Sequence, residues 1–463
     1  MDLRQALRSQ QPNALALVGP GGSWTRAELA DAVERRALEL RSRLEPGALH
    51  PCTLLPDPAG ITELLATWSL GAIAAPLGPR LTEDEASRAR NALARASADQ
   101  RIPPGTAAIL WTSGTAGTPR GVALTRAGLE ASASATRVRL ELTPTDVWFA
   151  ALSLSHVGGL ALVTRALLLE CPLVAPGSFR ADELLHSILG NTAAGPVTHV
   201  SLVPTQLRRL LDLWGSRPPP ESFRCALVGG AAAPEALLQR ALDGGWPVAL
   251  TYGMTEMTSQ VATASPALVR VKPGTVGAPL QGTEIRIDAD GQVRVRGPTH
   301  AAGYVGTGEP MLAEDDWYLT GDLGRIDEDG DLWIVGRASS RILTGGVTVD
   351  PHEVEAVLRT HPGVVDVCVV GVPDEEWGER VAALVVPVGR ETSEDVGQVH
   401  ESVPPSPLLR LLEPWAGERL GAARLPRVWL TAPSLPLNAN GKVDREAVRA
   451  RVASARPPES LTS

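Results

Sequence analysis

The sequence predicts an α/β protein with two lobes, and three patterns indicate this class. Through the first three hundred residues, short apolar runs typical of buried strands alternate with helix-like runs, which favours mainly parallel sheets covered by helices on both faces. Near residue 275 the pattern changes to alternating polar and apolar residues with Asp-Gly turns, which predicts a small barrel-like part. After residue 340, a helix, two strands and a final helix predict a small α+β lobe.

The elements of the large lobe follow from local runs. Apolar runs at residues 107–112, 199–204, 225–230 and 247–253 are typical of strands, and helix-like segments follow the second and third of them. Residues 147–164 form the longest uncharged stretch, close in length to a membrane span, but serine, histidine and glycine interrupt it. We therefore expect a strand, a loop and the start of a buried helix there.

The elements of the small lobe follow the barrel-like part, which is expected at residues 276–297. A helix is expected at 351–361, strands at 364–372 and 380–388, and a loop entering a helix at 436–452. The large lobe accordingly extends to about residue 336.

Composition excludes several classes of protein. The chain has 463 residues, of which 44% are hydrophobic, so a large core is expected and disorder is not. The net charge is −9 and no basic block is present, which disfavours nucleic-acid binding. The four cysteines lie far apart, so we expect neither a disulfide framework nor structural zinc, and a reducing cytoplasm fits. The charged N-terminal segment lacks the apolar core of a signal peptide.

Lysine is rare in this chain. Of the 43 basic residues, 41 are arginine, and the two lysines are Lys272 and Lys442. A coding bias of this strength replaces lysines that supply only a positive charge. The two that remain therefore indicate positions where an ammonium on a thin stem is needed.

A loop of small and hydroxyl-bearing residues follows the strand at 107–112. Backbone N–H and hydroxyl groups in such a loop can surround a polyphosphate. The Gly-Lys-Ser/Thr ending of a Walker loop is missing, which disfavours a Walker-type ATPase. By itself this segment is equally an ordinary surface turn. Its residues are Thr112, Ser113, Gly114, Thr115, Ala116, Gly117, Thr118, Pro119, Arg120 and Gly121.

The loop resembles the phosphate loop of the acyl-adenylate-forming superfamily, which includes acyl-CoA ligases, amino-acid adenylation domains and luciferases. It departs from the family pattern at Ala116, where the family has Thr, and at Arg120, where the family has Lys. Arginine keeps the positive charge, but its rigid planar group differs from lysine in reach. Taken singly, each motif has a structural explanation, whereas six in the family's order indicate membership. The further motifs are residues 228–231, 252–256, 318–322, 336–337 and 440–442.

The resemblance implies a role for each motif. Tyr252 stacks on adenine, Thr255 meets the α-phosphate, and Glu256 holds Mg²⁺, a hard cation that prefers carboxylate oxygens. Asp322 and Arg337 contact the ribose. The implied nucleotide-binding set is Thr112, Ser113, Gly114, Thr115, Gly117, Thr118, Arg120, Gly229, Gly230, Ala231, Tyr252, Gly253, Met254, Thr255, Asp322 and Arg337.

The resemblance also implies a two-step reaction that uses ATP, Mg²⁺ and CoA. Lys442 bridges the acid and the α-phosphate while the acid displaces pyrophosphate, and the small lobe then rotates about a hinge at 337–341 that includes Ser339. Gly346 borders the tunnel through which the CoA thiol reaches the adenylate. The implied domains are a core at residues 1–336, this hinge, and a mobile C-terminal domain at 342–463. The implied catalytic residues are Lys442, Thr255, Glu256 and His156.

The segment 151–159 indicates which class of carboxylic acid is the substrate. Amino-acid adenylation domains have an Asp there for the substrate ammonium, and this chain has no acidic residue, which disfavours a free amino acid. His156 occupies the place of the histidine that lines and gates the acyl pocket of acyl-CoA ligases. A lone histidine in an apolar run is more often packed in a core, and its position in the motif favours the pocket.

Within the ligases, residues 201–207, residues 252–260 and the compact length resemble the o-succinylbenzoate–CoA ligases of menaquinone biosynthesis. This resemblance places Ser259 and Gln260 in the acyl pocket. The acid has a second carboxylate, for which Arg208 and Arg209 are candidates by proximity in sequence.

Three alternatives to an o-succinylbenzoate–CoA ligase stay open at this stage. They are another aryl- or acyl-CoA ligase, a stand-alone adenylating enzyme that loads a carrier protein, and a non-catalytic adenylate-binding relative, which retention of Lys442 disfavours. We expect a small-molecule carboxylic acid, ATP and CoA as partners, no nucleic acid, no stable membrane insertion and a cytoplasmic location. A homodimer is compatible with the resemblance.

Overall fold

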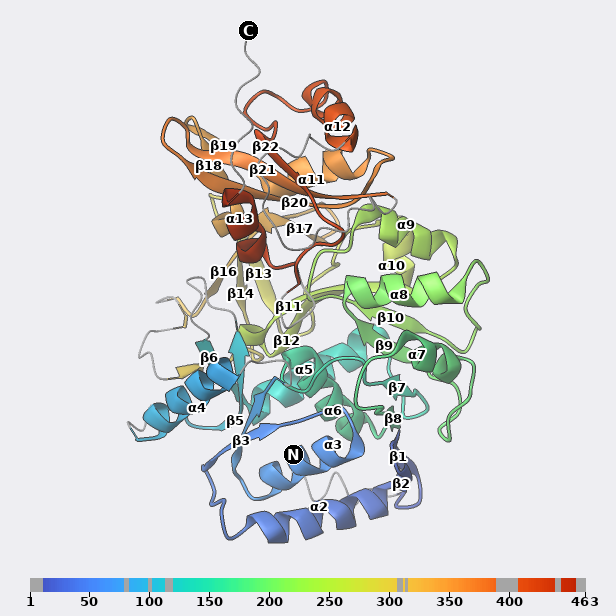
Figure 1. Ribbon diagram of the computed structural model, residues 1–463. Coiled ribbons are helices and arrows are strands. Elements are labelled where there is room, and N and C mark those ends of the chain that lie inside the picture. Colours follow the sequence, from blue (N-terminus) through green and yellow to red (C-terminus); the bar gives the residue numbers. More distant parts are fainter. Residues whose placement is uncertain are drawn as a thin grey trace. The chain divides into compact units, whose positions relative to one another are not determined.

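The chain forms two compact units in the computed structural model (Figure 1). One consists of Met1–Thr320 and Arg325–Ile334, and the other of Gly321–Gly324 and Val335–Ser463. A short 3-10 helix, η2 (Ala338–Ser340), lies where a hinge is predicted, and the hinge motion stays a prediction. The structure describes residues 11–78, 83–98, 102–112, 120–305, 311–312, 315–388, 407–437 and 443–454.

An eight-stranded sheet, in the order β12-β11-β10-β9-β7-β8-β1-β2, forms the centre of the first unit. The six inner strands run parallel, and antiparallel β12 and β2 lie at the edges, which confirms the predicted mainly parallel arrangement. The predicted strands at 199–204, 225–230 and 247–253 are β9, β10 and β11. The bounds are β1 (Leu15–Gly19), β2 (Gly22–Thr25), β7 (Trp148–Phe149), β8 (Leu173–Val174), β9 (His199–Leu202), β10 (Cys225–Val228), β11 (Val248–Met254) and β12 (Ser259–Ala264).

Helices cover this sheet because their apolar faces require burial. Leu207 and Leu210 of α8 and Leu237 of α9 join Val200 and Val228 of the strands in one core cluster. Within the part of the chain that the structure describes, no helix is both long and apolar enough to cross a membrane. The helices of this unit are α2 (Arg26–Leu40), α3 (Pro58–Ser69), α4 (Glu83–Ala98), α5 (Arg126–Leu140), α6 (Val157–Leu169), α7 (Ala181–Ile188), α8 (Pro204–Trp214), α9 (Glu235–Asp243), α10 (Pro266–Val271) and the 3-10 turn η1 (Thr255–Met257).

A five-stranded sheet, in the order β15-β6-β5-β4-β3, flanks the predicted phosphate loop. β5 and β6 form an antiparallel hairpin in which Thr112 pairs with Arg120. The intervening residues 113–119 lie outside the described residues. The bounds are β3 (Leu49–Thr53), β4 (Ile73–Leu77), β5 (Thr106–Thr112), β6 (Arg120–Thr125) and β15 (Gly303–Val305).

The predicted barrel-like part is a four-stranded sheet in the order β13-β14-β16-β17. β13 and β14 form an antiparallel hairpin closed by a turn in which the N–H of Gly291 donates to the carbonyl of Asp288 at 3.0 Å. This turn confirms the predicted Asp-Gly signal. The bounds are β13 (Glu284–Ile287), β14 (Gln292–Arg296), β16 (Tyr318–Ile326) and β17 (Leu332–Arg337).

The second unit contains a mixed sheet in the order β19-β18-β21-β20, with β22 pairing to β21. The expected helix, two strands and final helix are α11, β20, β21 and α13, whereas the β18–β19 hairpin, α12 and β22 were not predicted. Asp350 and Asp444 cap α11 and α13 by accepting N–H bonds in their first turns. The bounds are β18 (Ile342–Thr344), β19 (Val347–Val349), α11 (Pro351–Arg359), β20 (Val364–Asp374), β21 (Gly378–Pro387), α12 (Pro407–Gly417), β22 (Val428–Thr431) and α13 (Arg445–Ala453).

All four cysteines are free, as the spacing predicts. Burial raises the pKa of the thiols of Cys52, Cys171, Cys225 and Cys368 to about 12. They are therefore thiols rather than reactive thiolates at neutral pH.

Candidate active site

The predicted adenine motifs lie at the carboxyl ends of two neighbouring parallel strands, β10 and β11, and so at the carboxyl edge of the large sheet. The backbone approaches closely here: a Cβ on Gly229 would lie 2.5 Å from the Cγ2 of Thr251, and one on Gly253 would lie 2.0 Å from the carbonyl oxygen of Ser259. Glycine is therefore required at both positions. The structure brings the segments 229–231 and 252–254 to one edge, as expected for a nucleotide site.

A tight turn joins β11 to β12 and carries the predicted metal ligand. Thr258 and Ser259 have positive φ angles of 50° and 105°, which non-glycine residues rarely adopt. Gly253 pairs with Gln260, and Met254 pairs with Ser259. The turn therefore places the predicted acyl-pocket residues directly beside the adenine motif, and such strain is common at binding sites.

The half-buried carboxylate of Glu256 belongs to a cluster that the sequence did not predict. The hydroxyl of Tyr304 donates to Oε1 of Glu256 at 3.3 Å and lies 3.3 Å from the hydroxyl of Tyr318. The guanidinium carbon of Arg120 lies over the Tyr304 ring, 5.4 Å from its centre. Burial raises the pKa of Tyr304, so its phenol stays protonated and can donate.

A signal for this cluster was present in the composition. The chain has only three tyrosines, of which Tyr252 and Tyr318 lie in predicted motifs, and the third is Tyr304. Glu256 supplies the carboxylate oxygens that Mg²⁺ prefers, with a cation and neutral hydroxyl groups around it. These residues fit a magnesium-bound polyphosphate.

The two predicted ribose residues meet within the second unit. Nε of Arg337 lies 2.9 Å from Oδ1 of Asp322, and the Asp322 side chain is the more buried of the two, at 17% exposed against 56%. This ion pair orients the carboxylate that would accept from the sugar hydroxyls.

The predicted pocket residue Gln260 is 3% exposed and is bonded inside the protein. Its Oε1 accepts from Oγ1 of Thr136 and from Nη2 of Arg165, both at 2.8 Å, and its Nε2 donates to Oγ1 of Thr263 at 2.8 Å. Gln260 therefore orients Arg165, and its contact with a substrate stays a prediction.

Arg165 is the second residue that sequence reasoning missed. Its side chain on α6 is 2% exposed, and its Nε and Nη1 have no hydrogen-bond partner within the part of the chain that the structure describes. Among the described residues no carboxylate forms an ion pair with it, and its guanidinium lies 4.8 Å from the ring centre of Trp148. Burial lowers the pKa of Arg165 to about 10, so it remains charged at neutral pH. By contrast, Arg209 is exposed and Arg208 is only half-buried.

His156 stands at the N-cap of α6, and its imidazole makes no capping bond to that helix. It is half-buried, between core and solvent. Its role as a gate to the pocket stays a prediction.

Gly345 and Gly346 form the two-residue turn between β18 and β19, with φ angles of 54° and 78°. Such a turn favours glycine at both positions. A Cβ on Gly345 would lie 2.5 Å from the ring of Trp377, whereas one on Gly346 would meet no atom of the described residues within 4 Å. The open side of Gly346 is where the CoA tunnel is predicted.

The remaining predicted site residues cannot be placed. Ser113, Gly114, Thr115, Gly117, Thr118 and Lys442 lie outside the described residues. Thr112 is placed: its hydroxyl donates to the carbonyl oxygen of Arg120 at 3.4 Å, at the base of the loop.

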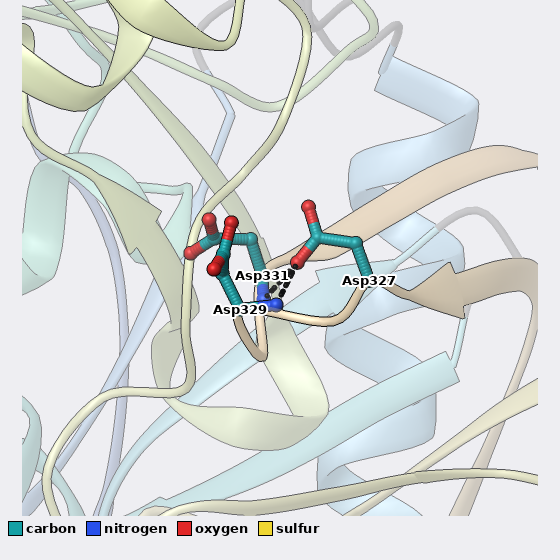
Figure 2. Close-up of side chains that lie close together, drawn as sticks. All are labelled: Asp327, Asp329 and Asp331. Carbon is teal, nitrogen blue, oxygen red and sulfur yellow. Dashed lines mark hydrogen bonds between the residues drawn. The ribbon is translucent and has the colours of Figure 1, made fainter.

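A cluster of three carboxylates lies away from these motifs, in the turn between β16 and β17 (Figure 2). Nζ of Lys272 lies 3.0 Å from Asp327, 2.6 Å from Asp329 and 2.8 Å from Asp331. The ammonium thus occupies the position that a metal ion would take. Lys272 therefore has a structural role in holding this turn.

Comparison with known proteins agrees with this site. A sequence model of the AMP-binding enzyme family matches residues 89–305, and one of the AMP-binding enzyme C-terminal domain matches residues 353–442. The 2-succinylbenzoate–CoA ligase of Bacillus anthracis is 35% identical over 352 residues, which cover 74% of this chain and 69% of that protein. The enzyme of the same name from Bacillus mycoides has the same identity and coverage.

Solved structures give the same result. The o-succinylbenzoate CoA synthetase of Bacillus subtilis, in complex with its acyl-adenylate intermediate, superposes with a TM-score of 0.84 at 29% identity and 99% coverage of both chains. ATP-bound MatB from Rhodopseudomonas palustris superposes with a TM-score of 0.83 at 25% identity, covering 98% of this chain and 99% of its own. Together with the motif order and the geometry around Glu256, these matches confirm the predicted resemblance: the chain belongs to the AMP-binding enzyme family.

Proposed function

We propose that this protein is an AMP-forming acid–CoA ligase that converts 2-succinylbenzoate to 2-succinylbenzoyl-CoA, a step of menaquinone biosynthesis. The names of its relatives support this reaction, and one observation on this chain carries the choice of acid. Arg165 is a buried cation held by Gln260 beside the adenine motif, and two of its guanidinium nitrogens have no partner among the residues that the structure describes.

The argument from Arg165 is electrostatic. An unpaired buried charge is costly, so a site that keeps one is suited to a ligand that supplies the opposite charge. 2-Succinylbenzoate has two carboxylates, of which one is activated and the other must be bound as an anion. A guanidinium with unused donors supplies the positive charge and the N–H groups that a carboxylate needs. Benzoate and fatty acids have no second carboxylate to offer.

In the first half-reaction the acid carboxylate attacks the α-phosphorus of ATP and pyrophosphate leaves. Glu256 would hold Mg²⁺, which offsets phosphate charge, and Arg120 adds a second positive group. Tyr252 and the segment 229–231 would bind adenine, and Asp322 with Arg337 the ribose. Lys442 would bridge the acid and the α-phosphate.

In the second half-reaction the CoA thiol attacks the acyl carbonyl and AMP leaves. Gly346, with open space on its side chain position, suits the close passage of pantetheine. Rotation about residues 337–341 would bring the C-terminal domain from one half-reaction to the other. The four free cysteines fit a reducing cytoplasm, and sedimentation would test the homodimer that the resemblance allows.

The first experiment measures pyrophosphate release with ATP, Mg²⁺ and CoA over 2-succinylbenzoate, benzoate, a medium-chain fatty acid and several amino acids. Strong preference for 2-succinylbenzoate, with its CoA thioester detected by mass, is the expected result. Preferred turnover of another acid would contradict the proposal that 2-succinylbenzoate is the substrate. Thiolation of a phosphopantetheinyl protein but not of CoA would favour a carrier-loading enzyme.

The second experiment tests Arg165 itself. Loss of a buried charge pair costs about 2–5 kcal/mol, so Arg165→Met should raise the KM for 2-succinylbenzoate by about thirtyfold or more. ATP–pyrophosphate exchange with a slow substrate that has one carboxylate, benzoate, should be retained. Arg209→Met on the exposed face of α8 is the matched control. An equal loss of activity with 2-succinylbenzoate and with benzoate would show that Arg165 does not recognise the second carboxylate.

A further inference from the structure

We propose that Tyr304 is a positioning residue that holds the phosphate-loop cation Arg120 and the metal-site carboxylate Glu256 in one arrangement. This inference rests on the proposed function, because it concerns how the same site binds MgATP. It adds a residue that lies outside the six motifs.

One side chain contacts both charged groups through different parts of its ring. The hydroxyl of Tyr304 donates to Oε1 of Glu256 at 3.3 Å, and the ring face lies 5.4 Å from the guanidinium carbon of Arg120. The phenol is neutral, so its hydrogen bond orients the Glu256 carboxylate without neutralising the negative charge that would hold Mg²⁺. The negative face of an aromatic ring attracts a guanidinium that lies over it.

The backbone of Tyr304 is fixed to both partners as well. In β15, Tyr304 pairs with Val122 of β6, the strand that begins at Arg120. Two residues before the strand, the N–H of Ala301 donates to the carbonyl of Glu256 at 2.8 Å, and the N–H of Ala302 donates to the carbonyl of Ala123 at 2.8 Å. The five-residue segment 301–305 therefore bridges the turn that carries the metal ligand and the strand that carries the cation.

This arrangement explains why arginine, rather than lysine, suits position 120. A guanidinium is planar and less strongly hydrated than an ammonium, so it lies well on an aromatic face. A side chain already ordered on that face loses less rotamer freedom when phosphate binds. We therefore expect Tyr304 and Arg120 to act as a pair in nucleotide binding.

The test measures ATP binding by calorimetry with and without Mg²⁺, and follows the thermal midpoint of each variant. Tyr304→Phe keeps the ring and removes the hydroxyl, so it should weaken binding by about threefold to tenfold with Mg²⁺ and leave binding in EDTA nearly unchanged. Tyr304→Leu removes the ring as well, so it should also weaken binding in EDTA. In the Tyr304→Leu background, Arg120→Lys should cause a smaller further loss than it does alone.

A matched control comes from a second arginine over an aromatic ring. Arg217 lies 4.8 Å from the ring centre of Trp214, away from the site, and Arg217→Lys should leave ATP binding unchanged. Equal loss of binding by Tyr304→Phe with and without Mg²⁺, or additive effects of the Tyr304 and Arg120 variants, would overturn the inference. Failure of the wild-type protein to bind MgATP would overturn the proposed function and this inference together.

Discussion

His199 is a buried imidazole whose surroundings keep it neutral. It is 1% exposed, lies stacked on Trp148 with ring centres 4.9 Å apart, and its Nδ1 is 2.7 Å from Oγ1 of Thr198. Asp146 lies 3.5 Å from the ring but is already paired with Arg224 at 2.6 Å. Burial is the largest cause that lowers the pKa of His199 to about 4, and the Asp146 carboxylate opposes it.

This pKa predicts acid sensitivity. The unfolded state binds a proton near pH 6.5, whereas folded His199 binds one near pH 4. Proton binding by His199 in the unfolded state therefore lowers the free energy of unfolding as the pH falls from 6.5 toward 4, by up to about 3 kcal/mol. Above pH 6.5 this loss is absent. Urea unfolding of wild type and His199→Asn across this range measures it. The difference in unfolding free energy should shrink with falling pH, and a constant difference would contradict the prediction.

A second single-residue prediction concerns Lys442, which lies outside the described residues. Lys442→Ala should reduce acyl-adenylate formation by at least about a hundredfold, since a positive group between two anions is lost. Thiolation of a pre-made adenylate by CoA should be spared. Single-turnover assays of each half-reaction measure the two effects separately. Equal loss in both would remove the assigned role.

At the scale of elements, the Lys272 cluster ties α10 to the turn between β16 and β17. Asp327 also accepts N–H bonds from Asp329 and Asp331, at 3.1 and 2.9 Å, which shapes the turn (Figure 2). A hydrogen bond from Trp333, followed by that from Lys272, lowers the pKa of Asp327. The hydrogen bonds that the Lys272 ammonium donates to the three aspartates raise the pKa of Lys272.

This cluster predicts that arginine cannot replace Lys272. An ammonium directs three N–H groups at three converging carboxylates, whereas a planar guanidinium directs its donors outward in a fork. Both Lys272→Arg and Lys272→Met should lower the urea midpoint of the chain, with Arg270→Met on the same helix as the control. A wild-type midpoint for Lys272→Arg would show that only the charge is needed.

At the scale of the whole molecule, the two units carry different parts of the predicted chemistry. The first contains the adenine edge and the cluster around Glu256, and the second contains Asp322, Arg337 and Gly346. The range of the second unit also includes Lys442. Lys442, assigned to the first half-reaction, and Gly346, assigned to the second, are different positions of that unit, so we expect substitutions there to impair one half-reaction at a time.

Gly346→Trp tests this separation. A bulky ring at the open side of the β18–β19 turn should reduce CoA thioester formation by about tenfold or more while ATP–pyrophosphate exchange continues. Because the position has a positive φ, Gly346→Asn is the control for backbone strain. A parallel fall in exchange and thioester formation would place Gly346 outside the tunnel.

Much of the fold could be predicted because burial patterns are local. The fully buried runs that became β9 and β10, the Asp-Gly turn after β13 and the uncharged run that became α6 each have a signal within a few residues. β22 had none: it joins its sheet by pairing parallel to β21, and such pairing is decided by a distant strand. The β18–β19 hairpin, two three-residue strands, was too short for a periodic signal.

The sequence by itself determined the family, the order of the motifs and the identity of the charged residues, because these depend on residue types at short spacings. Only the tertiary structure decided which of those residues meet. Tyr304 lies between Arg120 and Glu256 because β15 pairs with β6. Arg165 has no carboxylate partner among the described residues because α6 buries it against β7 and β12. Both facts are contacts between segments far apart in the chain, and the free energy of such contacts depends on packing that no local pattern contains.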